Sequence, residues 1–414
     1  MSDNNKDGIM NNDEIDGIIA RYCKNFFPRI EGEENLDNVT LEVKKEISKP
    51  FRREKNRTIN AKKIISEVKE KIAPYLTIAE TDSIKSTIES ITETFFNKII
   101  VKNFLELEEI TNSDIAKNII EGLEYWRNKT HEGKKVSYGI IVDTDPKDAP
   151  NTLNLFKILR EDYMAPVADG LNSFIIIDIN GNIIDYKQYD KFYADSMLPY
   201  RFSSTAEEAI PNTQKIMILT NLGDILLISD RELKYVKKAK QWIQYIDVAE
   251  ILADQISLIH KKPIEKNDIL IRRIYQTCLD VSFAKTGCII GIIKVEHEED
   301  VKSLVSEDIK NSSEYREKQN FFFLNKNNKN SKLNFNAIGR YKRKELASID
   351  GSFIINTNGK VLNIGDIISI KGGSSSGGRN AAALEISKYG IGIKVSTDGY
   401  IKIFKDDKPL IRIE

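Results

Sequence analysis

The feature that most constrains this chain is a loop of small residues, GGSSSGG at positions 372–378, followed by Arg379, Asn380 and an alanine run at 381–383. Glycine and serine loops expose backbone N–H groups, and an alanine-rich segment favours a helix whose N-terminus attracts anions. Upstream, Asp350 and Gly351 stand before an apolar run typical of a strand. A carboxylate for a metal, a loop of backbone donors and a helix N-terminus together suit a nucleoside triphosphate.

Length and charge set the broad class. A chain of 414 residues predicts two or three domains, and 41% hydrophobic with 30% charged residues fits a globular protein. Lys plus Arg and Asp plus Glu are both 62, so a zero net charge gives no strong nucleic-acid signal and no attraction to an anionic membrane. The polar N-terminus has no signal-peptide core and no segment is apolar enough to span a bilayer, so we expect a cytoplasmic protein.

Cysteine and histidine usage excludes two kinds of site. Cys23, Cys278 and Cys288 have no CxxC spacing, which predicts reduced thiols instead of a disulfide framework or a zinc site. The three histidines are widely scattered, so a histidine metal cluster is not expected.

Patterning predicts an α/β (α+β) chain. Its helical N-terminal part includes a helix that Thr81, Asp82 and Ser83 cap, and its middle part contains antiparallel hairpins around Asn180-Gly181 and 221–224. Residues 231–259 are predicted to be helical. The expected organisation is a disordered tail 1–13, a helical region 14–133, an α+β module 134–262 and a C-terminal domain 263–414.

The C-terminal domain is predicted in more detail. It begins with an amphipathic helix from Ile269, then has a fully apolar strand over 288–293 and a polar surface segment over 300–341. A hairpin at Asn358-Gly359, a helix over 380–387 and a last hairpin turning at Asp398-Gly399 follow.

An internal echo links the middle and the end of the chain. Asp169-Gly170 lies before SFII at 173–176, and Asp350-Gly351 precedes SFII at 352–355. Each is followed by an Asn-Gly turn and a second strand. Either the chain contains a diverged duplication, or two Asn-Gly hairpins simply look alike.

The order of these features resembles the diadenylate cyclase (DAC) domain family, from about Ile269 to the end. Asp350-Gly351-Ser352 corresponds to the family's Asp-Gly-Ala motif, and the segment beginning Gly377-Gly378-Arg379-Asn380 to its Gly-x-Arg-His-Arg motif. The resemblance implies an α/β domain with a mixed sheet. It also implies that two such domains face each other, as in a homo-oligomer, and form cyclic di-AMP from ATP.

Site roles follow from that resemblance. Asp350 would be catalytic and would hold Mg²⁺ or Mn²⁺ near the ribose 3′-hydroxyl. The expected nucleotide-binding residues are Gly351, Ser352, Ser376, Gly377, Gly378, Arg379 and Asn380.

The sequence also departs from the family. The Arg-His-Arg triplet becomes Arg379-Asn380-Ala381, which loses an imidazole and a guanidinium. Two functions are therefore in view: a metal-dependent nucleotidyltransferase that forms a cyclic dinucleotide, or a degenerate domain that binds ATP or another nucleotide without turnover. A purely structural interaction protein is a third.

Simpler interpretations of the same residues also stay open. Asp350-Gly351 suits an ordinary turn, Arg379 a surface charge and the Gly/Ser loop a linker.

The middle of the chain has a resemblance of its own. Residues 125–140, from Tyr125-Trp126-Arg127 to Gly139-Ile140, are similar to sensor modules that precede DAC-like domains in bacterial conflict systems. This implies that the front of the chain senses a signal and regulates the C-terminal site.

Overall fold

The computed structural model describes most of the chain beyond residue 80. The described residues are 29–30, 70, 81–106, 113–145, 153–206, 210–245, 248–260, 268–305, 307–313, 315–317, 333–370 and 377–413. The predicted tail 1–13, and Cys23 with it, lie outside this set.

Residue contacts divide the chain into two compact units that are not contiguous in sequence. Unit 1 comprises residues 1–27, 33–191 and 207–245. Unit 2 comprises residues 28–32, 192–206 and 246–414. Unit 2 therefore includes a short segment, 192–206, that lies in sequence between two parts of unit 1.

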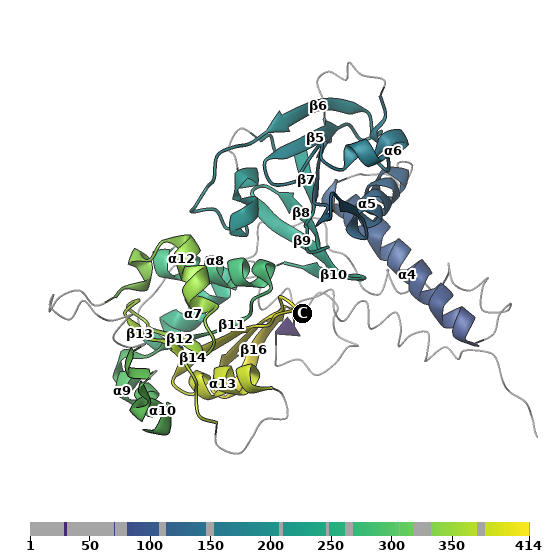
Figure 1. Cartoon of the computed structure of the whole chain (residues 1–414). Helices are drawn as coiled ribbons and strands as arrows, with labels where there is room; N and C mark the ends of the chain where they lie inside the picture. The colour runs from purple at the N-terminus through teal and green to yellow at the C-terminus, as the bar shows by residue number, and fades with distance from the viewer. Residues whose placement is uncertain are drawn as a thin grey trace, which may run out of the picture. The chain divides into compact units, whose positions relative to one another are not determined.

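Unit 1 is a seven-stranded sheet with helices against it (Figure 1). Its strand order is β10-β9-β8-β7-β4-β5-β6, in which only the β4–β5 pair is parallel. The strands are β4 (Tyr138–Asp143), β5 (Ser173–Ile177), β6 (Ile183–Gln188), β7 (Gln214–Leu219), β8 (Ile225–Ser229), β9 (Glu232–Lys238) and β10 (Gln241–Gln244). The other elements are α4 (Thr81–Phe104), α5 (Ser113–Arg127), the β2–β3 ribbon (Thr130–His131 and Lys134–Lys135), α6 (Leu155–Ile158) and the 3-10 turn η4 (Asp162–Met164).

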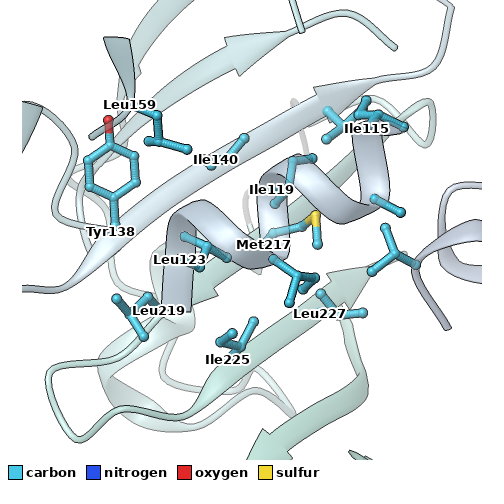
Figure 2. Close-up of a cluster of buried hydrophobic side chains, with 14 of the residues drawn as sticks. Ile115, Ile119, Leu123, Tyr138, Ile140, Leu159, Met217, Leu219, Ile225 and Leu227 are labelled. Carbon is cyan, nitrogen blue, oxygen red and sulfur yellow. The ribbon is translucent and has the colours of Figure 1, made fainter. Parts of the chain in front are cut away.

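The core of unit 1 forms where α5 covers one face of this sheet. Figure 2 shows Ile119 and Leu123 of α5 pointing at Ile140 of β4 and Met217 of β7. The spacing of Ile119 and Leu123 follows the helical repeat, while alternate residues of each strand face the helix. Burial of these apolar groups is the main stabilising term for such a layer.

Unit 2 is a second seven-stranded sheet, with order β1-β16-β15-β14-β11-β12-β13. The strands are β1 (Arg29–Ile30), β11 (Cys288–Ile293), β12 (Ser352–Asn356), β13 (Val361–Asp366), β14 (Gly390–Val395), β15 (Ile401–Lys405) and β16 (Lys408–Ile413). The helices are α7 (Val248–His260), α8 (Ile269–Ala284), α9 (Glu298–Lys302), α10 (Glu307–Asn311), α12 (Arg340–Ala347) and α13 (Gly378–Ser387), with 3-10 turns η5 (Tyr200–Ala206), η6 (Val295–His297) and η7 (Phe335–Ala337).

Helices cover both faces of the second sheet. Ile289 and Ile293 of β11 pack with Ala383 and Ile386 of α13. Figure 1 shows α13 on one side and α8 and α12 on the other. Because successive side chains of a strand point to opposite faces, a strand between two helical layers is apolar throughout, as the sequence predicted for 288–293.

The two sheets repeat one topology. β11 pairs parallel with β12 and antiparallel with β14, as β4 does with β5 and β7. β1, from the N-terminal part of the chain, takes the place that β10 has in unit 1.

The repetition extends to irregularities. Register shifts fall between Ile176 and Ile177 in unit 1 and between Ile354 and Ile355 in unit 2. A second pair of shifts falls after Leu227 and after Ile403. Bulges are local features that coincidental hairpins need not share, so the repeat is structural and not a resemblance of turns alone.

The structure corrects the predicted secondary structure in two regions. Residues 231–245 were predicted to be helical but form strands β9 and β10. Tyr235 and Val236 are strong strand formers, and their pairing across the turn at Ala239 outweighs the helical spacing that Trp242 suggested. The predicted surface segment 300–341 contains α10 and part of α12. The predicted hairpins at Asn180-Gly181, Asn358-Gly359 and Asp398-Gly399 are confirmed.

The units differ between their third and fourth strands. Unit 2 has α13 between β13 and β14, whereas the described residues between β6 and β7 contain only the 3-10 turn η5. The loop-and-helix feature that suggested a nucleotide site thus has no counterpart among the described residues of unit 1.

Candidate functional site

Asp350 and Gly351 form the turn between α12 and β12. Asp350 is exposed, and Gly351 has a φ of 110°, a conformation that suits glycine. A Cβ atom at Gly351 would lie 2.4 Å from the carbonyl carbon of Gly365, so the close approach of β13 also requires glycine here. Ser352 is buried and its hydroxyl donates to the backbone oxygen of Asp366 over 2.9 Å. The turn is therefore held rigidly while its carboxylate faces solvent.

Arg379 lies in the first turn of α13 and reaches the turn before β11. A Cβ atom at Gly287 would lie 2.5 Å from Nη1 of Arg379, so the guanidinium group rests against the Gly287 backbone. Burial raises the pKa of the Cys288 thiol to about 12, although a backbone hydrogen bond from Val395 and the positive charge of Arg379 act in the opposite direction. Cys288 is thus a neutral buried thiol. The positive charge of Arg379 is close enough to the start of β11 to act on this thiol.

The structure brings these two residues to the same end of the sheet. Because β11 and β12 are parallel, Gly287 before one strand and Asp350 before the other lie at the same end. The Thr286 and Ser348 hydroxyls are 2.8 Å apart and join the two turns directly. Asp350 and the Arg379 guanidinium therefore flank one stretch of the sheet, as the nucleotide hypothesis requires.

The other predicted residues begin α13. Gly377 precedes the helix with a φ of 86°, and Gly378 is its first residue. Both are exposed, and no atom of the described residues lies within 4 Å of a Cβ built on either one. Asn380 is half-buried in the same turn. Ser376 lies outside the described residues.

Sequence reasoning missed a second carboxylate beside this turn. Asp366, at the end of β13, is 2% exposed, and its backbone nitrogen would lie 2.8 Å from a Cβ at Gly351. Burial and the Asp366 carboxylate raise the pKa of the Tyr315 hydroxyl. The sequence signal was the Gly365-Asp366 pair at a strand end, which looked like part of an ordinary hairpin.

The donor set is compatible with a magnesium–nucleotide complex. No group of three or more His, Cys, Asp or Glu side chains able to hold a metal exists among the described residues. Magnesium is commonly bound by one or two carboxylates together with substrate phosphates, so Asp350 would suffice once a triphosphate is present. The charge of Arg379 and the N-terminus of α13 supply favourable contacts for its phosphates.

Asn172, and not Asp169, is the register counterpart of Asp350. The pairing of Ile177 with Ile183 in unit 1 corresponds to that of Ile355 with Val361 in unit 2. Counting back five residues from Ile177 and from Ile355 gives Asn172 and Asp350, which are therefore equivalent positions of the repeat. Asp169 instead accepts backbone N–H groups from Leu171, Asn172 and Ser173. Burial opposes ionisation, but these bonds outweigh it and lower the pKa of Asp169. This carboxylate has a structural role in its turn.

Comparisons with known proteins give a partial match. No family model matches the chain. It is 43% identical over 72 residues, 16% of this chain, to a diadenylate cyclase of Methanocaldococcus jannaschii. That stretch spans only 23% of the relative's length.

Among solved structures, a double mutant of DacA from Staphylococcus aureus is similar, with 18% identity over 35% of this chain and 87% of that one. The TM-score of this match is 0.24. Among the described residues, no helix has the length and apolarity needed to cross a bilayer. The sequence match to the archaeal cyclase supports a DAC-like domain within this chain.

Proposed function

We propose that unit 2 is a metal-dependent nucleotidyltransferase that forms a cyclic dinucleotide from ATP. The observation that carries the proposal is the placement of Asp350 and Arg379 at one end of the sheet. Asp350 lies in one of the two turns that the Thr286–Ser348 hydrogen bond joins, and Arg379 rests against Gly287 in the other. In this reaction a ribose 3′-hydroxyl attacks the α-phosphate of a second ATP and pyrophosphate leaves. A metal-bound carboxylate is suited to lie near the attacking hydroxyl, and a guanidinium is suited to stabilise the negative charge that develops on the phosphate.

Each residue then has a defined role. Asp350 binds Mg²⁺ or Mn²⁺ and lies near the 3′-hydroxyl that attacks. When bound, the metal supplies Lewis-acid stabilisation of the phosphoryl oxygens. Arg379 and the N-terminus of α13, which begins after Gly377, bind the phosphates, and the Gly351 turn holds Asp350 in place beside β13.

The chemistry also implies an oligomer. Joining two nucleotides into a ring requires two nucleotide sites close together, so we expect the active form to contain at least two copies of unit 2. Unit 1 would regulate the site.

The test is incubation of the full chain with ATP and Mg²⁺ or Mn²⁺, followed by chromatography of the products. We expect a cyclic dinucleotide from the wild type and none from Asp350→Asn. Asp300→Asn is the matched control, because Asp300 is an exposed carboxylate of unit 2 that follows the opposite end of β11. Product from Asp350→Asn at the wild-type rate would reject the assignment.

A binding module without turnover is the second candidate. Asn380 and Ala381 provide no charge where the family motif has two basic residues, so less stabilisation of the transition state is available. Calorimetry with ATP and with cyclic dinucleotides separates the two. Binding without product favours the module, and the absence of both binding and product eliminates both candidates.

A further inference from the structure

The segment 192–206, here called the strap, is fastened into unit 2 although its chain neighbours belong to unit 1. It follows β6 and precedes β7, both strands of the unit 1 sheet. Leu198, Phe202, Ser203 and Ser204 of the strap are buried. Phe202 meets Phe283 of α8 edge to face, with ring centroids 6.4 Å apart.

A buried arginine joins the strap to the helices of unit 2. The Arg340 side chain is 4% exposed and that of Asp280 is 1% exposed. Arg340 donates from Nε and Nη2 to the two oxygens of Asp280, at 2.7 and 2.8 Å. It also donates to the backbone oxygens of strap residues Ala194, Ser196 and Leu198.

This arrangement uses the full donor capacity of the guanidinium. Arg340 has five N–H groups, and the two bonds to Asp280 and three to the strap account for all of them. Asp280 in turn accepts the backbone N–H of Tyr200, also in the strap, over 2.7 Å. A lysine has three donors on a single atom and cannot reproduce this planar set.

A second polar side chain reinforces the contact. Gln276 of α8 donates to the backbone oxygens of Ala194 and Ser196, over 3.3 and 3.0 Å. Its own oxygen accepts from Arg343 of α12 over 3.1 Å. Strap, α8 and α12 thus share one buried hydrogen-bond network.

The helices in this network are the two that lead into the candidate site. α8 ends at Ala284 and continues into the Thr286–Gly287 turn, against which Arg379 rests. α12 begins with Arg340 and ends at Ala347, three residues before Asp350. A displacement of either helix therefore moves one half of the site relative to the other.

We infer that the strap is a positioning device by which unit 1 controls the spacing of the Thr286–Gly287 and Asp350 turns. Arg340 and Asp280 are positioning residues in this device, since they act through α8 and α12. The strap is continuous in sequence with β6, and this covalent connection is the route by which unit 1 would act on the network. The inference rests on the proposed function for its consequence on nucleotides, but its structural part is independent of it.

The test compares Arg340→Lys and Ser196→Ala with the full-length wild type. Ser196→Ala removes only the hydroxyl that accepts the Leu198 N–H within the strap. Lys344→Ala is the control, because Lys344 lies on α12 but pairs with the exposed Glu345. Hydrogen exchange is followed at residues 285–288 and 346–351, with β15 as the internal reference, and ATP affinity by calorimetry.

We expect Arg340→Lys and Ser196→Ala to exchange faster at residues 285–288 and 346–351, while β15 stays protected. ATP binding should weaken about ten-fold or more, because small misplacements of binding groups carry such losses. The control should match the wild type in both measurements. Unchanged exchange at the turns, or faster exchange throughout unit 2, would overturn the inference. If the variants exchange faster only at the two turns and the wild type binds no nucleotide, the proposed function is rejected but the coupling through the strap still holds.

Discussion

The backbone of Gly287 lies directly against the guanidinium group of Arg379, with no room for another atom between them. Gly287 also has a φ of 75°, in the left-handed region. Both the contact and the backbone conformation therefore require glycine at this position.

We predict that Gly287→Ala displaces Arg379 and weakens ATP binding at least about ten-fold. Its backbone strain should also cost about 1–2 kcal/mol of unfolding free energy. Calorimetry and urea denaturation measure the two effects. Gly359→Ala is the matched control: its φ is 78°, so the strain is similar, but its nearest atom is Oδ1 of Asn334. Equal ATP affinity in the two variants would show that Arg379 does not contribute to binding.

At the residue scale, the sequence was informative wherever a residue's role is local. Asp350 before a strand and Arg379 at a helix start were both recognised from their immediate neighbours. The Thr286–Ser348 bond and the burial of Asp366 were not, because each depends on a strand register between segments far apart in the chain. Ser352 was expected to lie against the nucleotide, which stays a prediction, and the bond of its hydroxyl to the backbone oxygen of Asp366 was not predicted.

At the element scale, helix α13 packs closely against the sheet at a glycine of β14, where no side chain intervenes. A Cβ atom on Gly392 of β14 would lie 1.9 Å from the backbone oxygen of Ala383 in α13. The helix can approach this closely only because the strand has glycine there.

Gly392→Ala should therefore push α13 away from β14. We expect a loss of unfolding free energy of about 1–3 kcal/mol from overpacking. ATP binding should weaken as well, because Arg379 begins the same helix. Ile391→Val serves as the control, since the Ile391 side chain points to the other face of the sheet. Removing one buried methyl group there costs about 0.5–1.5 kcal/mol of unfolding free energy. ATP affinity that falls equally in both variants would contradict the role given to α13.

Elements with strong local turn signals were predicted best. Asn-Gly and Asp-Gly pairs identified three hairpins, and the apolar run 288–293 identified β11 with its correct bounds. The region 231–245 was predicted wrongly, because its apolar residues suit a helical face and a paired strand equally well. Whether this segment becomes a helix or a strand depends on its pairing with β8. The spacing of apolar residues within the segment carries no information about that pairing.

At the scale of the whole molecule, the chain contains one sheet topology twice, but within the part of the chain that the structure describes only unit 2 has the helix of the candidate site. The sequence echo suggested the repeat but aligned Asp169 with Asp350, whereas the strand registers align Asn172 with it. The membership of residues 192–206 in unit 2 could not be predicted, because a local pattern does not indicate which core a segment joins.

Because residues 192–206 belong to unit 2, we expect that the sequence range 263–414 does not fold stably by itself. In a fragment of that range, the N–H groups of Arg340 that now bind the strap would lose three backbone acceptors, and Asp280 would lose the Tyr200 donor. The Arg340–Asp280 pair itself would remain, but each hydrogen-bonding group that loses its strap partner and stays buried costs about 1–3 kcal/mol. That is a large share of the total stability of a domain of this size, typically about 5–15 kcal/mol.

We therefore predict that the 263–414 fragment shows no cooperative thermal unfolding by circular dichroism under conditions where the full chain does. The double variant Arg340→Met/Asp280→Leu tests the cause, because replacing a buried ion pair by apolar groups of similar size is often neutral or stabilising. Made in the fragment, it should recover part of the cooperative transition, since no guanidinium N–H or carboxylate oxygen is then left without its strap partner. A wild-type fragment that melts as cooperatively as the full chain would mean that α8 and α12 hold their positions without the strap. In that case unit 1 would have no route to the Asp350 turn through this network.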